Sequence, residues 1–365
     1  MGIFTHEQSY LGVDIGSANI KVVELKNEHG RARLATYGFV EQSTDIVKTN
    51  SQEETQRTAR LLAAIVEKAK AGTRKAVSAL PNFSVFSSVM SLPQMSQKDL
   101  SQAVHWEAKK FVPLPIEEMV IDWKVLPGPG KREGASAASG PVSAAAGTAE
   151  SAQALVRVLL TAAPKNLVER YVQLFKLANL ELTGLETESF ALERALVGND
   201  PNPAMIMDIG ALTSDIMVVE HGITLLNRSV DVGGITITKA IAGSLGVDAR
   251  RAEQFKRDMG FTAQSDGGIF KIIESSISPI INELKYCFDL YRSQEGERRV
   301  SRIILTGGSA FLPELSEYLT RLLAIKVFIG DPWARVIYPA ELRPALEELG
   351  PRFAVAVGLA MREIG

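Results

Sequence analysis

Two stretches of this chain, far apart along the sequence, repeat the same pattern of apolar strands and turns. Each contains an apolar strand, an Asp-x-Gly turn, a second apolar strand and a His-Gly pair, and the turns read DIGSAN and DIGALT. The first copy spans residues 11–30 and the second spans residues 206–222, and further strands follow at 33–40 and 224–230. Short strands separated by tight turns predict antiparallel hairpins. We therefore expect two related α/β lobes that each begin with a hairpin.

The two copies differ in the spacing of their Val-Val pairs. Asp14 and Val22 are 8 residues apart, whereas Asp208 and Val218 are 10 residues apart. This difference predicts that the second turn is two residues longer than the first.

A stretch with another order of elements lies between the two copies. The expected elements are strands at 75–80, 85–92, 119–126 and 155–161, a helix from Ser96 to Phe111 and a helix beginning at Pro164. They predict a small α+β subdomain at about 82–180. Within it, residues 127–152 are rich in Gly, Ala, Ser and Pro and cannot bury enough apolar surface to offset their ordering entropy, which predicts a flexible loop. The expected division is a first lobe at 1–81 and 181–200, this inserted unit, and a second lobe at 201–365.

Composition excludes several classes of protein. With 365 residues, 46% of them hydrophobic, the chain can build the cores of two or more folding units. Its net charge of −2 lacks the basic excess of a nucleic-acid-binding protein. The single cysteine, Cys287, permits no intrachain disulfide, and the four scattered histidines predict no zinc site. We recognise neither a membrane span nor a signal peptide, so a cytoplasmic location is expected.

The two Asp-x-Gly turns are candidate phosphate-binding sites. Glycine lets the backbone approach an anion closely, and successive N–H groups in a turn form an anion-binding nest. The candidate residues are Gly16, Ser17, Ala18, Asn19 and Lys21 in the first copy and Gly210, Ala211 and Thr213 in the second. Asp14 and Asp208 end the strands before the turns, where each can order water around Mg²⁺. A single such turn is often an ordinary β-turn, but two at equivalent places in a repeat favour a polyphosphate clamp.

Two more glycine turns and one helix complete a candidate nucleotide site. The turn residues are Gly233 and Gly234 before one helix, and Gly307, Gly308 and Ser309 after the strand VSRIIL. Bare glycine backbone in such turns can accept a flat ring. Glu253 and Lys256 lie three residues apart on one face of the next helix, where they form either a solvated ion pair or a ribose or base contact.

In combination these motifs resemble the actin-like ATPase superfamily, which includes actin, DnaK-type chaperones, sugar kinases, MreB and FtsA. DIGSANIK is similar to its first phosphate motif, DIGALTSDI to its second and LTGGSA to its adenosine motif. AEQFKRDMG resembles the nucleoside-contacting stretch of FtsA and MreB, and the unit at 82–180 resembles the small extra subdomain of FtsA. Two longer stretches, ALPNFSVFSSVMSLPQMSQKDLSQAVHWEAKKFVPLPIEEMVIDW and DPWARVIYPAELRPALEELGPRFAVAVGLAMR, are similar to the PilM family of type IV pilus assembly proteins.

This resemblance implies an actin-like fold that binds ATP with Mg²⁺ between its two lobes. It also implies a cytoplasmic protein, peripheral to the inner membrane, that docks the N-terminal cytoplasmic peptide of a PilN-like inner-membrane protein and links it to the pilus motor ATPases. No residue is assigned as a catalytic base, so at most a weak ATPase activity is expected. Two alternatives remain open within the superfamily, an FtsA-like cell-division filament protein and an ATP-dependent small-molecule kinase.

Overall fold

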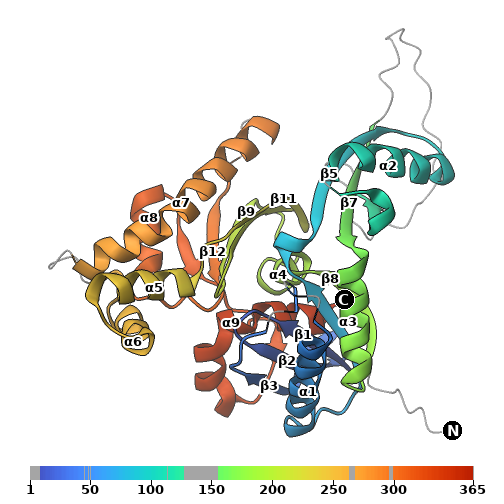
Figure 1. The fold of residues 1–365 in the computed structure, drawn as a ribbon. Coiled ribbons are helices and arrows are strands. Elements are labelled where there is room, and N and C mark those ends of the chain that lie inside the picture. Colours follow the sequence, from blue (N-terminus) through green and yellow to red (C-terminus); the bar gives the residue numbers. More distant parts are fainter. Residues whose placement is uncertain are drawn as a thin grey trace. The chain divides into compact units, whose positions relative to one another are not determined.

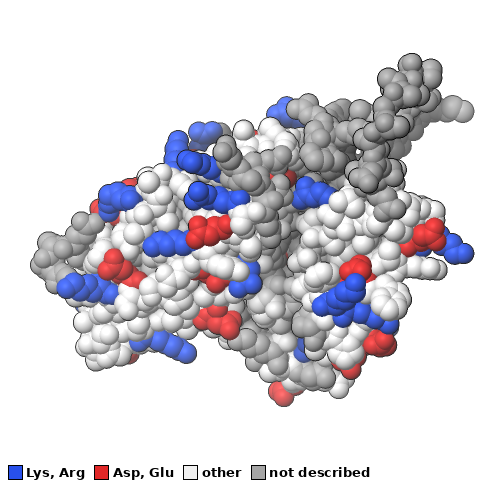
Figure 2. All heavy atoms as spheres, turned by 90° about the horizontal axis from the view of Figure 1, so that it is seen from above, with Lys and Arg blue, Asp and Glu red and all other residues white. Residues whose placement is uncertain are grey.

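The structure, a computed structural model, describes residues 9–44, 46, 47, 49, 51–112, 114–126, 155–262, 268–295 and 299–364 (Figure 1). The chain forms two compact units, Met1–Ser84 with Glu169–Gly365, and Val85–Val168. The smaller unit lies within the range 82–180, and the loop expected at 127–152 lies outside the described residues. Within the described ranges, no helix is both long enough and apolar enough to cross a bilayer. Acidic and basic side chains both occur across the face shown in Figure 2.

The first sheet of the larger unit begins with the expected antiparallel hairpin. Its strands, in spatial order, are β14 (Val336–Ile337), β3 (Arg31–Val40), β2 (Ile20–Glu28), β1 (Ser9–Ile15), β4 (Lys75–Leu80) and β8 (Glu181–Thr187). The strands β1, β2 and β3 are antiparallel, whereas β4 and β8 extend the sheet in the direction of β1. The helix α1 (Gln52–Lys68) follows β3 and begins at Ser51, whose hydroxyl accepts the N–H of Glu54 at 3.3 Å.

The second sheet starts in the same way. Its strands, in spatial order, are β11 (Ile223–Val230), β10 (Ser214–Glu220), β9 (Ala204–Ile209), β12 (Arg302–Thr306) and β13 (Val327–Ile329). In the chain, the helices α5 (Gly234–Leu245), α6 (Ala249–Met259) and α7 (Gly268–Glu295) lie between β11 and β12, and α8 (Leu315–Leu323) lies between β12 and β13. The apolar face of α7, including Ile277 and Leu284, is fully buried in one core with Met207 and Ile216 of the sheet. This core holds the turn after β9 on a rigid base.

The two hairpin turns have the same length, so the expected difference of two residues is wrong. The turns are residues 16–19 and 210–213, and Asp14 lies opposite Lys21 just as Asp208 lies opposite Asp215. The register of a hairpin is set by its turn and not by the identity of one side-chain pair. The Val-Val pairs of the two copies therefore lie at different places along their strands.

The end of the chain packs on the first sheet, although the sequence prediction assigned 201–365 to the second lobe. The strand β14 pairs with β3, and the helix α9 (Arg343–Met361) buries Phe353 and Ala356 in a core with Val23. Another part of α9 joins a core that includes residues of both sheets and of α4 (Glu188–Leu196). Because α9 is apolar on several sides, it can be buried between the sheets instead of lying on one of them.

The smaller unit is a three-stranded antiparallel sheet covered by one helix. Its strands β5 (Phe86–Pro93), β7 (Leu155–Pro164) and β6 (Met119–Val125) pair in that order, and α2 (Gln97–Phe111) precedes β6. Ser96, at the expected start of this helix, caps α2, since its hydroxyl accepts the N–H of Asp99 at 3.2 Å. Leu100 and Val104 of the helix are buried with Leu160 of the sheet. The helix α3 (Lys165–Leu177) follows β7.

Candidate functional site

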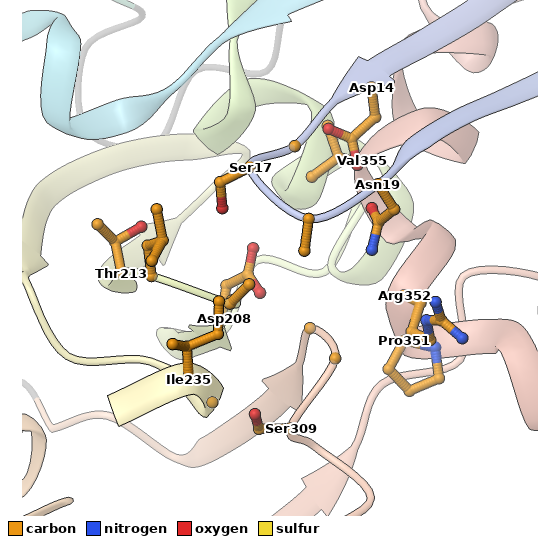
Figure 3. A pocket seen from close by; sticks show the side chains of 18 of the residues that line it. Asp14, Ser17, Asn19, Asp208, Thr213, Ile235, Ser309, Pro351, Arg352 and Val355 are labelled. Atoms are coloured by element: carbon orange, nitrogen blue, oxygen red, sulfur yellow. The ribbon is translucent and has the colours of Figure 1, made fainter. Parts of the chain in front are cut away.

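The turns of the two hairpins are closed by the same backbone hydrogen bond. The Gly16 N–H donates to the Asn19 carbonyl at 2.9 Å, and the Gly210 N–H donates to the Thr213 carbonyl at 3.0 Å. In Figure 3 Ser17 and Thr213 approach the same pocket from these two turns. Equivalent turns from the two sheets therefore face one space.

This space is a cavity of about 680 Å³ within the larger unit. It is lined by sixteen of the residues that the sequence proposed: Asp14, Gly16, Ser17, Ala18, Asn19, Lys21, Asp208, Gly210, Ala211, Thr213, Gly234, Glu253, Lys256, Gly307, Gly308 and Ser309. Gly233 is not among the lining residues; a Cβ atom there would lie 2.6 Å from the Ala211 carbonyl oxygen. Gly233 thus allows the start of α5 to pack on the second turn, where the Gly234 N–H donates to the Gly210 carbonyl at 2.9 Å.

One region of the cavity brings several carboxylates together near the ammonium group of Lys21. Asp14 is buried and forms an ion pair with Lys21, with Oδ2 and Nζ 2.5 Å apart. At the equivalent positions of the second hairpin, Asp208 lies opposite a second carboxylate, Asp215. Glu188, the first residue of α4, also lines the cavity. The carboxylates of Asp14, Asp208, Asp215 and Glu188 therefore share this region with the ammonium group of Lys21.

Burial, with repulsion between neighbouring carboxylates, makes Asp208, Asp215 and Glu188 difficult to ionise. Desolvation raises the pKa of Asp208 to about 7; Asp215 and Asp14 act in the same direction, and Lys21 opposes them. Desolvation also raises the pKa of Asp215 to about 6, against a hydrogen bond from the Ser229 hydroxyl. It holds the pKa of Glu188 well above its usual range, with further contributions from Asp215, Asp14 and Asp208. A cation in this region would offset that repulsion, so the residues present fit a hydrated Mg²⁺ ion. The described residues contain no cluster of three or more His, Cys, Asp or Glu side chains placed to hold a metal ion directly.

Backbone at the end of β12 also lines the cavity, beside Asp208. Gly307 has φ +87°, and the Ser309 N–H donates to the Ile209 carbonyl at 3.1 Å. Nothing lies within 4 Å of the place where a Cβ atom on Gly308 would stand. This stretch therefore presents open backbone to the cavity, which suits a flat ring.

Glu253 and Lys256 line the cavity as an ion pair. The Lys256 ammonium lies 2.6 Å from Glu253 Oε2 and donates to the Gly234 carbonyl at 3.1 Å and to the Thr238 hydroxyl at 2.9 Å. Burial lowers the pKa of Lys256, and the contacts with Glu253 act in the opposite direction. The pair is not simply solvated, because Lys256 is buried and fastens α6 to the start of α5.

Several lining residues escaped the sequence analysis. They are Glu41, Thr44 and Val47 after β3, Glu188 on α4, Asp215 on β10, Phe311 after β12 and Glu348, Pro351, Arg352 and Val355 on α9. Asp215 could have been predicted from the sequence, since it is the counterpart of Lys21 in the repeat. Glu188 directly follows a strand of the sheet, where ligand-binding side chains often lie. Pro351 and Arg352 lie at one side of the pocket in Figure 3, and no local motif marks them.

Two lobes with equivalent hairpin turns around one cavity define an actin-like ATPase fold, as the motifs predicted. The model of the family described as Type IV pilus assembly protein PilM matches residues 12–364. The chain therefore belongs to the PilM family of type IV pilus assembly proteins, which confirms the resemblance found in the sequence.

Solved structures agree with this assignment. A chain of a PilM–PilN type IV pilus biogenesis complex is similar over 98% of both chains, with 26% identity and a TM-score of 0.80. The ethanolamine utilization protein EutJ from Carboxydothermus hydrogenoformans has 18% identity and a TM-score of 0.55, over 97% of this chain and 89% of that chain. MreB 5 of Spiroplasma citri bound to AMPPNP has 12% identity and a TM-score of 0.54, over 98% and 96% of the two chains. At these identities, EutJ and MreB 5 show the fold alone.

A curated relative is more distant. The cell division protein FtsA of Bacillus subtilis (strain 168) is 23% identical over 250 residues, which are 62% of this chain. The chain spans about half of that relative's length, 54%. The match to the PilM family covers nearly the whole chain, so it favours this family over the two alternatives left open by the sequence.

Proposed function

We propose that this protein binds ATP with Mg²⁺ in the cavity between its two sheets. The observation that carries this proposal is the pair of equivalent glycine turns, Gly16–Asn19 and Gly210–Thr213, which line one cavity from two sheets. The turn backbone and Lys21 would bind the phosphates, and the backbone of Gly307 and Gly308 would lie against the base. Asp14 and Asp208 would hold Mg²⁺ through water, and the metal would neutralise phosphate charge. The similar MreB 5 structure, bound to AMPPNP, supports nucleotide binding in this fold.

We further propose that the protein binds the N-terminal cytoplasmic segment of a PilN-like inner-membrane protein. The similarity to a chain of the PilM–PilN complex supports this partner. Such binding would place the protein at the cytoplasmic side of the inner membrane and link that partner to the pilus motor ATPases. A ligand that contacts both sheets favours the arrangement in which both sets of contacts are made. ATP would therefore act as a conformational ligand that changes affinity for the partner.

Two binding measurements test these proposals. Purified protein is titrated calorimetrically with ATP in the presence of Mg²⁺ and, separately, in EDTA; we expect binding that weakens without the metal. A fluorescent peptide with the N-terminal sequence of the PilN-like protein is then titrated with and without ATP. Since coupling is reciprocal, peptide and ATP should change each other's affinity by the same factor. Equal peptide affinities would refute the conformational role, and absence of ATP binding would refute the nucleotide site.

A matched control exists for the metal-binding carboxylates. Asp208→Ala should lose stabilisation by ATP and Mg²⁺, which follows RT ln(1 + [L]/Kd). Asp289→Ala removes a carboxylate from an exposed position on α7, outside the cavity lining, and should retain the stabilisation.

A further inference from the structure

The first turn is held by the segment that joins β3 to α1. We call the described residues 41–44, 46, 47 and 49 of this segment the strap. The Thr44 hydroxyl donates to the Gly16 carbonyl at 2.9 Å, and the Thr44 N–H donates to the Ser17 carbonyl at 3.1 Å. Thr44 is buried, and Thr44 and Val47 line the cavity. The strap therefore contacts two successive peptide groups of the turn.

These two contacts set the direction of two N–H groups. A trans peptide is planar, and its C=O and N–H point in opposite directions. The carbonyls of Gly16 and Ser17 point to Thr44, so the N–H groups of Ser17 and Ala18, which share those peptides, point away from it. Two successive N–H groups that point to one side make an anion-binding nest. Thr44 thereby fixes the donors that a phosphate group would use.

The strap is itself held by arginines from three helices. Arg57 on α1 donates to the Ser43 carbonyl at 3.2 Å, and Arg352 on α9 lies 2.6 Å from the Glu41 carboxylate. Arg170 on α3 donates to two carbonyls, those of Thr49 and, at 3.4 Å, of Val47. Between these contacts Ile46 is buried, with 1% of its surface exposed. Charge-assisted hydrogen bonds to backbone are stronger than neutral ones, so these contacts hold the described residues of the strap in place.

We propose that Arg170 and Thr44 are positioning residues for phosphate binding: Arg170 fixes the strap, and Thr44 of the strap fixes the N–H groups of the first turn. This inference rests on the proposed nucleotide site, and it adds a segment and a helix that no motif of the sequence indicates. Neither residue needs to touch the nucleoside, because the ring is proposed to lie against the backbone of Gly307 and Gly308.

The test separates phosphate binding from nucleoside binding. Calorimetry measures Kd for ATP with Mg²⁺ and for adenosine in four variants of the full chain. Arg170→Gln and Thr44→Val should each weaken ATP by about tenfold, the equivalent of about 1.4 kcal/mol, and leave adenosine affinity unchanged. Lys176→Gln removes a charge from an exposed position on the same helix, and Thr44→Ser keeps the hydroxyl, so both should match the parent protein.

Three results would overturn the inference. Unchanged ATP affinity in Arg170→Gln and Thr44→Val would show that the strap does not position the turn. Equal losses of ATP and adenosine affinity would show a general structural role. If the parent protein binds neither ligand, the nucleotide site itself is wrong, and this outcome is distinct from the first two. Should Arg170→Gln fail to fold, Thr44→Val and its Thr44→Ser rescue decide the question alone.

Discussion

Gly307 and Gly308 are adjacent, but a methyl group should have different effects at the two positions. Gly307 has φ +87°, and a Cβ atom there would lie 2.2 Å from Asp208 Oδ1 and 2.5 Å from the Ile209 carbonyl oxygen. Gly308 has nothing within 4 Å of that place. In an L-residue the left-handed conformation costs about 1–2 kcal/mol, and overpacking costs about 1–3 kcal/mol. Gly307→Ala should therefore lose about 2–5 kcal/mol of stability, against total stabilities of about 5–15 kcal/mol.

Urea unfolding of Gly307→Ala, Gly308→Ala and the parent protein, followed by circular dichroism, measures these differences. Since the chain has two compact units, the transition to compare is the one that includes the larger unit. We expect Gly308→Ala to unfold with the parent protein and yet to bind ATP more weakly, because its methyl group would occupy open cavity backbone. If Gly307→Ala is as stable as Gly308→Ala, the backbone at Gly307 does not pack closely against Asp208.

Three further predictions concern single side chains. In EDTA, the raised pKa of Asp208, about 7, means that the native state binds a proton that the unfolded state releases near its usual pKa of 3.8. The free energy of unfolding should therefore fall as pH rises from about 4 to 7. Asp208→Asn should be more stable than the parent protein by up to about 4 kcal/mol at pH 7.5, but not at pH 4. A stability difference that is the same at both pH values would contradict this prediction. Tyr171 is fully buried, and its hydroxyl has no hydrogen-bond partner among the described residues. Thermal unfolding of Tyr171→Phe should therefore show a gain in stability of about 1 kcal/mol. A loss of stability would show that the hydroxyl forms a hydrogen bond. Ser96→Ala should lose about 1 kcal/mol of protection from hydrogen exchange in the first turn of α2, while Ser101→Ala, at an exposed position in the same helix, should lose much less.

Local features of the fold were predictable because they depend on residues close together in the chain. Alternating apolar strands and glycine turns indicated both hairpins, and Ser96 marked the start of α2. The repeat also placed Asp14 and Asp208 at equivalent positions, as the registers of the two hairpins show. The turn length was predicted wrongly, because the Val-Val pairs were compared by identity and the register follows the turn.

Which residues meet around the cavity was decided by contacts between distant segments. Glu188 lines the cavity because α4 starts where β8 ends. Thr44 lines it because the strap contacts the first turn. The return of β14 and α9 to the first sheet depends on pairing with β3 and on burial between two sheets, and no local pattern encodes either. The sequence alone thus determined the hairpins, the start of α2 and the positions of the glycine turns, because these depend on neighbouring residues. Only the tertiary structure decided which carboxylates repel one another and what holds the first turn, because burial and charge proximity arise when distant segments pack together.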